Sequence, residues 1–218
     1  LGEWLEYTGS VLAIDPSGRG QDETAYAIVK MQNGILYVKD AGGLKGGYGP
    51  ETLQALAFLA KQYKVNYTII ESNFGDGMFT QLIKPVLTRV HPVSIEEVRH
   101  NTNKEKRIID TLEPILNQHR LVVDDKVIQQ DYQSEVDLKY KLFYQLTRLT
   151  RDKGSLIHDD RLDALSIAVG YWVETMDRDI LRAVEDHKKD LLRDELDKFM
   201  ESSIGRPQKR DNWVQLRR

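Results

Sequence analysis

The stretch Val11-Leu-Ala-Ile-Asp15-Pro-Ser-Gly-Arg-Gly-Gln-Asp-Glu-Thr-Ala-Tyr-Ala-Ile-Val29 decides how the rest of the chain is interpreted. Its apolar start predicts a buried strand that ends on Asp15, followed by a polar, glycine-containing turn and a second, antiparallel strand. A carboxylate at the end of a buried strand is unfavourable unless its charge is compensated. Asp15 therefore either starts an Asx-type turn or binds a metal ion. The choice depends on partner carboxylates, for which Glu71 and Asp163 are the candidates.

Composition limits the class of protein. The chain has 218 residues, enough for one domain with a sizeable core, or for one domain with an appendage. It has no cysteine, which excludes disulfides and thiolate metal sites and favours a reducing compartment. No apolar run approaches the ~18 residues of a membrane span, and the first ten residues do not form a signal peptide. The net charge of −3 argues against a uniformly basic nucleic-acid-binding surface.

The hydrophobic pattern along the chain is typical of an α/β protein. It predicts a meander of three strands over residues 11–15, 24–30 and 35–41. Later strands are expected over 67–71, 93–98 and 121–123, and helices over 52–63, 78–90, 104–118, 124–138 and 159–176. A β-hairpin is expected from 143 to 158, with its turn at Asp152-Lys153-Gly154. This order predicts a mixed sheet with helices on both faces.

Two further segments bear on domain organisation. The glycines of 42–49 suggest a phosphate-binding loop, but the Walker spacing is absent and Pro50 follows, so a flexible surface loop is favoured. Composition changes near Thr175, where alternating acidic and basic residues begin. We therefore expect a domain over residues 1–175 and a charged, helical and then basic tail over 176–218. Because the chain opens at Leu1, we also expect it to be an excised part of a longer protein.

The third carboxylate, Asp163, lies in the first turns of the helix expected from residue 159. Asp159 and Asp160 lie one turn earlier on the same face. The helix dipole alone favours acidic residues there, so their position does not identify a ligand. The small side chains that follow Asp163 would let the helix approach the sheet closely. Three converging carboxylates repel one another, and hard divalent cations such as Mg²⁺ relieve that repulsion. Two such ions can activate a water and stabilise the leaving oxygen of a phosphodiester.

Together these motifs resemble the ribonuclease H-like nuclease domain of phage terminase large subunits of the short-tailed phage type. The matching pieces appear in the family's order: Ala13-Ile-Asp15-Pro-Ser, Ile69-Ile-Glu71-Ser-Asn, Lys104-Glu-Lys-Arg107 and Asp159-Asp-Arg-Leu-Asp163-Ala. The resemblance implies a ribonuclease H-like mixed sheet. It also implies that Asp15, Glu71 and Asp163 bind two catalytic Mg²⁺ or Mn²⁺ ions, with Asp160 as a further ligand.

The resemblance further implies a function and partners. The expected activity is metal-dependent cleavage of double-stranded DNA concatemers during viral genome packaging, in the cytoplasm of the infected bacterium. The expected partners are double-stranded DNA, the portal or procapsid and the small terminase subunit, with an ATPase domain upstream of this chain. Two alternatives stay open, because one scaffold hosts many chemistries. One is a catalytically degenerate docking module of a packaging assembly, and the other is a resolvase- or transposase-like nuclease.

Basic residues beside these motifs are candidates for contacting DNA. Lys104, Lys106 and Arg107 open a helix whose N-terminus suits a phosphate, although a solvated basic turn explains them equally well. A second group flanks the expected hairpin and would contact the DNA backbone: Arg148, Arg151 and Lys153.

Two other features are interpreted conservatively. His100 and His158 lack metal-ligand spacing and are interpreted as surface or capping residues. Beyond Gly205 the tail becomes basic around Trp213. This segment is either a solvated terminus or a peptide that docks to an acidic partner, for which the resemblance implies the portal.

Overall fold

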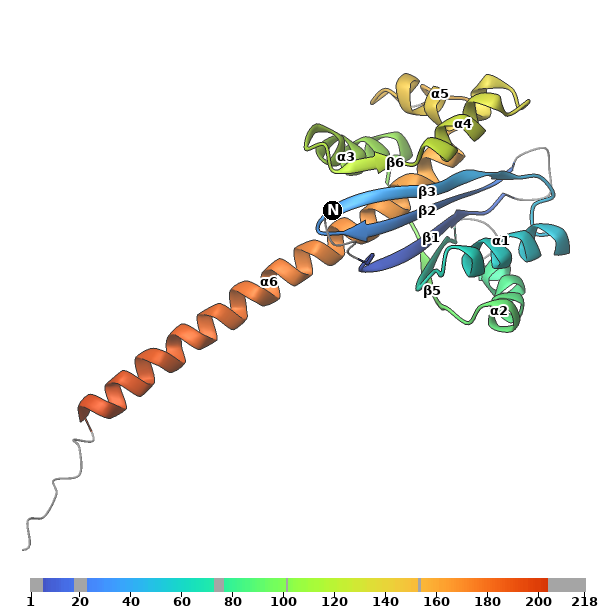
Figure 1. Ribbon diagram of the computed structural model, residues 1–218. Coiled ribbons are helices and arrows are strands. Elements are labelled where there is room, and N and C mark those ends of the chain that lie inside the picture. Colours follow the sequence, from blue (N-terminus) through green and yellow to red (C-terminus); the bar gives the residue numbers. More distant parts are fainter. Residues whose placement is uncertain (1–5, 18–22, 73–76, 101, 153, 204–218) are drawn as a thin grey trace, which may run out of the picture. The chain divides into compact units, whose positions relative to one another are not determined.

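The computed structural model describes residues 6–17, 23–72, 77–100, 102–152 and 154–203. The chain divides into two compact units, Leu1–Glu174 and Thr175–Arg218. The first unit contains a six-stranded sheet with helices on both faces (Figure 1). Among the described residues, no helix combines the length and the apolar character needed to cross a membrane.

The sheet is mixed, as the sequence predicts. Its strands are β1 (Gly9–Asp15), β2 (Thr24–Gln32), β3 (Ile35–Leu44), β4 (Tyr67–Glu71), β5 (Ser94–Val98) and β6 (Leu121–Val123), in the order β5-β4-β1-β2-β3-β6. The first three strands form an antiparallel meander. By contrast, β4 pairs with β1 in parallel, as β5 does with β4 and β6 with β3. The neighbouring strands β1 and β4 therefore end at the same edge of the sheet.

Six α-helices accompany these strands in the described part of the chain, and several of them begin at start signals in the sequence. They are α1 (Pro50–Gln62), α2 (Met78–Val90), α3 (Lys104–Asn117), α4 (Asp125–Gln133), α5 (Leu142–Arg148) and α6 (Asp160–Ser203), with a 3₁₀ turn, η2 (Leu138–Tyr140). Pro50 occupies the first position of α1, where a missing N–H is harmless. Asn103 caps α3, because its side chain accepts a hydrogen bond of 2.8 Å from the backbone N–H of Lys106.

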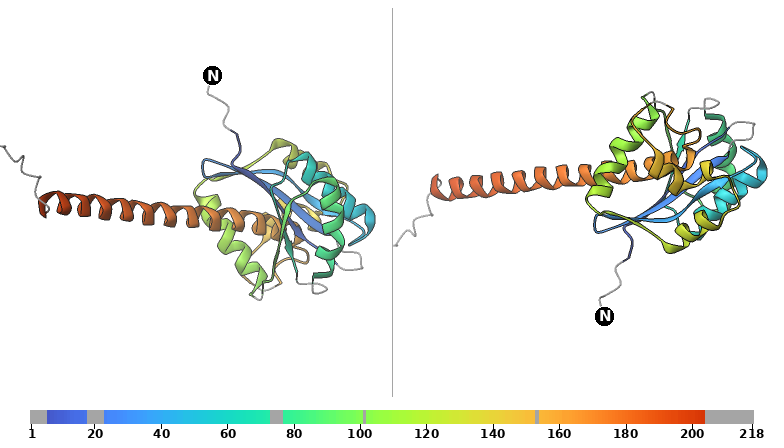
Figure 2. Two further views of the ribbon diagram at one scale, coloured as in Figure 1. Left: turned by 90° about the horizontal axis from the view of Figure 1, so that it is seen from below. Right: turned by 90° about the horizontal axis from the view of Figure 1, so that it is seen from above.

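The two faces of the sheet have different coverings (Figure 2). On one face, Leu12, Ile14 and Ile28 belong to a buried cluster with apolar residues of α1 and α2. On the other face lie α3 and the first part of α6, where Trp172 donates a hydrogen bond of 3.1 Å to the carbonyl of Val29. Because side chains alternate along β1, Asp15 lies opposite to Ile14 and faces α6.

The predicted hairpin over 143–158 is wrong, since residues 142–148 form the helix α5. Asp131 of α4 stabilises the start of this helix by accepting the backbone N–H groups of Leu142 and Phe143, at 2.9 and 3.1 Å. Gln145 is fully buried and accepts the N–H of Leu162. These interactions come from other elements, α4 and α6, 11 to 17 residues away in the sequence, and they outweigh the local strand-like pattern.

Two smaller corrections concern segment ends. The glycine-rich segment is not wholly a loop, because Gly42 and Gly43 belong to β3 and pair with Tyr26 and Ala25. The helix predicted over 124–138 ends at Gln133.

A buried ion network fixes the first turn of α6. The guanidinium of Arg161 binds the carboxylate of Glu23, which immediately precedes β2, and lies 3.5 Å from the carboxylate of Asp131 on α4. All three side chains are almost inaccessible to solvent. A buried charge without partners is strongly unfavourable, so these contacts hold three separate elements in one arrangement.

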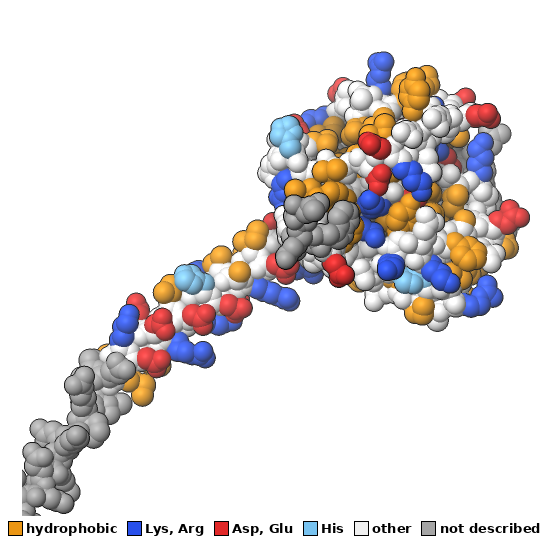
Figure 3. Space-filling model, viewed as in Figure 1, with side chains coloured by type: hydrophobic (Ala, Val, Ile, Leu, Met, Phe, Trp, Pro, Cys, Tyr) orange, Lys and Arg blue, Asp and Glu red, His pale blue; other side chains and the backbone are white. Residues whose placement is uncertain are grey.

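The second unit is described by the remainder of α6, from Thr175 to Ser203. Apolar side chains are exposed along it, among charged ones (Figure 3). They are Ile180, Leu181, Val184, Leu191, Leu192, Leu196, Phe199 and Met200. The basic segment after Gly205, including Trp213, lies outside the described residues.

We expect Arg161→Ala to lower the free energy of unfolding by about 3–5 kcal/mol, because it leaves two buried carboxylates without their cation. Arg151→Ala is the matched control. Arg151 also bridges two carboxylates, those of Asp110 and Glu113, but its side chain is 58% exposed against 6% for Arg161. The exposed ion pairs of Arg151 should contribute at most about 1 kcal/mol to the free energy of unfolding. Urea unfolding of both variants measures the difference, and equal losses would contradict the assignment.

Candidate metal centre

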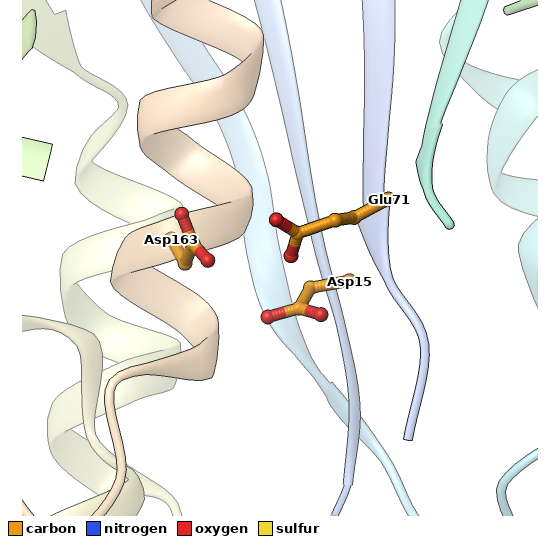
Figure 4. A group of neighbouring side chains, drawn as sticks. All are labelled: Asp15, Glu71 and Asp163. Carbon is orange, nitrogen blue, oxygen red and sulfur yellow. The ribbon is translucent and has the colours of Figure 1, made fainter. Parts of the chain in front are cut away.

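Three carboxylates converge at one edge of the sheet (Figure 4). Asp15 ends β1, Glu71 ends β4, and Asp163 lies in the first turn of α6. One oxygen atom from each lies within 4.8 Å of the others. The parallel pairing of β1 with β4 places the first two side by side, and the packing of α6 on this face supplies the third. The structure thus brings together the three residues that the sequence singles out.

The carboxylates of this cluster lie in a poorly solvated environment. Glu71 and Asp163 are buried, and the side chain of Asp15 is 13% exposed. Burial raises the pKa of Asp163 to about 6, and the neighbouring charge of Glu71 adds to the effect. Burial likewise raises the pKa of Asp15 well above its usual value, again with contributions from the other carboxylates. The arrangement therefore disfavours three negative charges unless cations are present.

Lys104, the first residue of α3, provides part of that positive charge. Its ammonium group lies 3.2 Å from Asp15, 2.9 Å from Asp159, 3.3 Å from Asp160 and 3.1 Å from Asp163. Burial by itself would lower the pKa of Lys104, but the surrounding carboxylates outweigh it and hold the pKa well above its usual value. Asp160 lies at the rim of the cluster, where burial raises its pKa.

Arg107 provides the second cation, one turn further along α3. Its Nη2 atom lies 3.2 Å from Glu71 and 2.9 Å from Asp163. Its Nη1 group donates a hydrogen bond of 2.6 Å to Nδ1 of His100, which in turn lies 3.1 Å from Glu71. Because Nδ1 of His100 accepts a hydrogen bond from Arg107, it carries no proton and cannot donate a hydrogen bond to Glu71. His100 therefore contacts two residues of the site, Glu71 and Arg107, while its side chain remains 30% exposed at the surface.

The charges of the site do not balance. Five carboxylates, those of Asp15, Glu71, Asp159, Asp160 and Asp163, face the two cations of α3. When all are ionised, three negative charges remain uncompensated. Clustered carboxylate oxygens are the ligands that hard divalent cations such as Mg²⁺ and Mn²⁺ prefer. The donor set therefore fits such an ion.

The remaining basic residues singled out from the sequence lie in different surroundings. Lys106 and Arg148 are exposed, and the guanidinium of Arg148 lies over the ring of Tyr144. Arg151 binds Asp110 and Glu113 on α3. Lys153 lies outside the described residues. The structure therefore does not gather Lys106, Arg148 and Arg151 into one group with Lys104 and Arg107.

Comparison with known proteins identifies the family. Residues 14–121 match the family described as "Terminase Bacteriophage T7, Ribonuclease H-like domain". The chain is 45% identical over 205 residues to the large subunit of terminase from Enterobacteria phage T3, an alignment that covers 91% of this chain. The same alignment covers 34% of the T3 protein, so the chain spans about a third of that relative's length.

Solved structures share the fold. The Mn-soaked human cytomegalovirus terminase nuclease domain matches with a TM-score of 0.54 and 14% identity, over 74% of this chain and 82% of that one. The nuclease domain of the large terminase subunit gp2 of bacterial virus Sf6 matches with a TM-score of 0.53 and 14% identity, over 77% of this chain and 90% of that one. The chain therefore belongs to the terminase large-subunit family, of which it contains the ribonuclease H-like domain.

Proposed function

We propose that this chain is a divalent-metal-dependent endonuclease domain that cleaves double-stranded DNA concatemers during viral genome packaging. The observation that carries the proposal is the convergence of Asp15, Glu71 and Asp163 within 4.8 Å on a ribonuclease H-like sheet. The cytomegalovirus nuclease domain, which has a similar fold, was soaked with Mn, and this supports Mn²⁺ as a candidate ion.

In this proposal Asp15, Glu71 and Asp163 hold two Mg²⁺ or Mn²⁺ ions, with Asp160 as a further ligand at the rim. When bound, such ions supply an activated water and stabilise the departing oxygen of a phosphodiester. The protein's contribution is to fix the three carboxylates on two strand ends and one helix, which are rigid elements. Arg107 orients Glu71 and Asp163 through its contacts with both.

Lys104 has a second role in the proposal. Without metal, its ammonium group compensates the carboxylates. Metal ions supply the same compensation, so Lys104 is then available for a phosphate of the substrate at the edge of the site. This reconciles its present contacts with its predicted role in binding DNA. Lys106, Arg148, Arg151 and Lys153 stay predictions as DNA contacts.

The proposal extends to the whole protein. This chain spans only a third of the T3 large subunit, and we propose that the ATPase domain implied by the family resemblance lies upstream in the rest of the protein. The proposed partners are the portal or procapsid and the small terminase subunit, in the cytoplasm of the infected cell. We propose the domain boundary near Thr175, where the two compact units meet in sequence.

The carboxylate assignment is tested by cleavage. We expect Asp163→Asn and Asp15→Asn each to reduce Mg²⁺- or Mn²⁺-dependent cleavage of plasmid DNA by at least about 100-fold, because an amide replaces an anionic ligand. Circular dichroism should show that both variants remain folded. The Asp110→Asn variant, which loses an exposed carboxylate on α3, should cleave DNA as fast as the unsubstituted chain. Full activity in both site variants would refute the assignment. An inactive unsubstituted chain would favour the docking-module alternative.

The raised pKa of Asp163 predicts a pH-dependent stability of the metal-free chain. An aspartate of the unfolded chain loses its proton near pH ~4, whereas burial holds the pKa of Asp163 at about 6 in the folded state. Between these values the folded state retains a proton that the unfolded state has lost. Raising the pH through this window therefore lowers the free energy of unfolding.

Asp163→Asn removes this titration and provides the comparison. Urea unfolding in EDTA should show the stability of the unsubstituted chain falling relative to that of the variant from pH ~4 to pH ~6. Parallel profiles of the two proteins would contradict the prediction.

Removing Lys104 should strengthen metal binding. An ammonium group about 4 Å from another charge interacts with it by at least about 1 kcal/mol, even with the dielectric constant of water. We therefore expect Lys104→Ala to bind Mg²⁺ at least about fivefold more tightly in titration calorimetry. Lys106→Ala removes the same charge from an exposed position two residues away and should leave the affinity nearly unchanged. Equal affinities in the two variants would argue against the role given to Lys104.

A further inference from the structure

Three cation–tyrosine pairs lie on the segment from α4 to α5. Each places a charged group above an aromatic ring, at a distance typical of a cation–π interaction. The pairs, with the distance from the charged group to the ring centre, are Lys139–Tyr140 (5.2 Å), Lys141–Tyr132 (5.9 Å) and Arg148–Tyr144 (5.8 Å). We call these six residues the cation–tyrosine surface.

None of the members of this surface belongs to the buried core, but three of them are half-buried: Lys139, Tyr140 and Lys141. The ring of Tyr132 is 82% exposed, and Tyr144 and Arg148 are exposed as well. Leu138, which precedes Lys139, is 64% exposed. In the space-filling view, basic, acidic and hydrophobic side chains lie among one another over the α4–α5 end of the first unit (Figure 3). Packing in the interior therefore does not explain why large aromatic residues occur here.

Residues 125–148 carry four basic and four acidic residues, and the basic ones are concentrated in the C-terminal half of this segment. Residues 138–151 contain four basic residues and no acidic residue, in a chain whose net charge is −3. Arg151 is neutralised by Asp110 and Glu113 of α3. Asp137 approaches Lys139 only to 3.9 Å and is 76% exposed, so this pair is weak. The surface keeps a net positive charge from Lys139, Lys141 and Arg148.

The surface adjoins the candidate metal centre. The ring of Tyr140 lies 4.3 Å from the ring of His158, measured between ring centres. His158 directly precedes Asp159, which lies 2.9 Å from Lys104 inside the site. A ligand bound across this surface would therefore extend toward the carboxylates.

We propose that the cation–tyrosine surface binds the sugar–phosphate backbone of duplex DNA on the way to the metal centre. The proposal rests on the proposed nuclease function. A cation held above a ring has fewer conformations to lose when it binds, so a phosphate is bound at a lower entropic cost. Because each ring already carries a cation, the surface contacts phosphates rather than stacking on bases, and its binding is independent of DNA sequence.

The test compares two triple variants of the 218-residue chain, both in an Asp163→Asn background so that DNA is not cut. One combines Lys139→Ala, Lys141→Ala and Arg148→Ala. The matched control combines Lys61→Ala, Lys84→Ala and Arg89→Ala, which remove the same charge from exposed positions of α1 and α2, on the other face of the sheet. Binding of a fluorescent duplex is measured from about 50 to about 200 mM salt. Melting temperatures verify that the variants are folded.

We expect the first variant to bind at least about tenfold more weakly, with a salt slope reduced by about 2–3, and the control to match the parent protein. Tyr132→Ala should weaken binding less and leave the slope unchanged, because the charge of Lys141 remains. Equal binding and equal salt slopes in the two triple variants would refute the proposed role of this surface in binding DNA. An acidic protein would then be the candidate ligand. Cleavage by the unsubstituted chain is measured separately. Its absence would refute the proposed nuclease function without affecting the binding comparison.

Discussion

Compensation of buried carboxylates is the constraint on which the rest of this domain depends. Asp15 and Glu71 end neighbouring parallel strands, and Asp163 meets them from α6, so three acidic groups share one poorly solvated space. Electrostatics would oppose this fold unless cations were provided nearby. The first turn of α3 provides them through Lys104 and Arg107, which contact every member of the cluster. The site therefore requires α3 to lie where its first residues can reach the carboxylates.

The position of α6 follows from a second set of buried charges. Arg161 is two residues before Asp163, and its contacts with Glu23 and Asp131 fix the helix start against β2 and α4. Further along the helix, Trp172 binds the backbone of β2. An Asp163 carboxylate held between these two anchors has little freedom to move away from the other carboxylates. Ion pairs in the interior contribute little net stability, but they specify one arrangement of the elements that carry the site.

The sequence predicts the local parts of this architecture better than the long-range ones. The predicted bounds of β4, α2 and β6 agree with the structure, because each is a short run of one periodicity between clear breaks. The sequence predicts a hairpin strand over 143–149, whereas residues 142–148 form the helix α5, because the hydrogen bonds accepted by Asp131 come from another element. His100 could not be identified either, because its neighbours Glu71 and Arg107 come from other parts of the chain. Asp15, Glu71 and Asp163 are identifiable from the sequence because each lies at the end or the start of a strand or helix with a clear hydrophobic pattern.

The proposed cleavage of DNA by an acidic chain requires that its positive charge lie at particular positions. The chain has a net charge of −3, and its candidate site alone carries three uncompensated negative charges when all of its groups are ionised. Without metal, this site repels a phosphate backbone. In the proposed mechanism, two divalent ions would reverse the sign of the local charge, so that a phosphate could approach the carboxylates themselves. Basic residues outside the site, such as those of the cation–tyrosine surface, would then hold DNA near it whether or not the ions are bound.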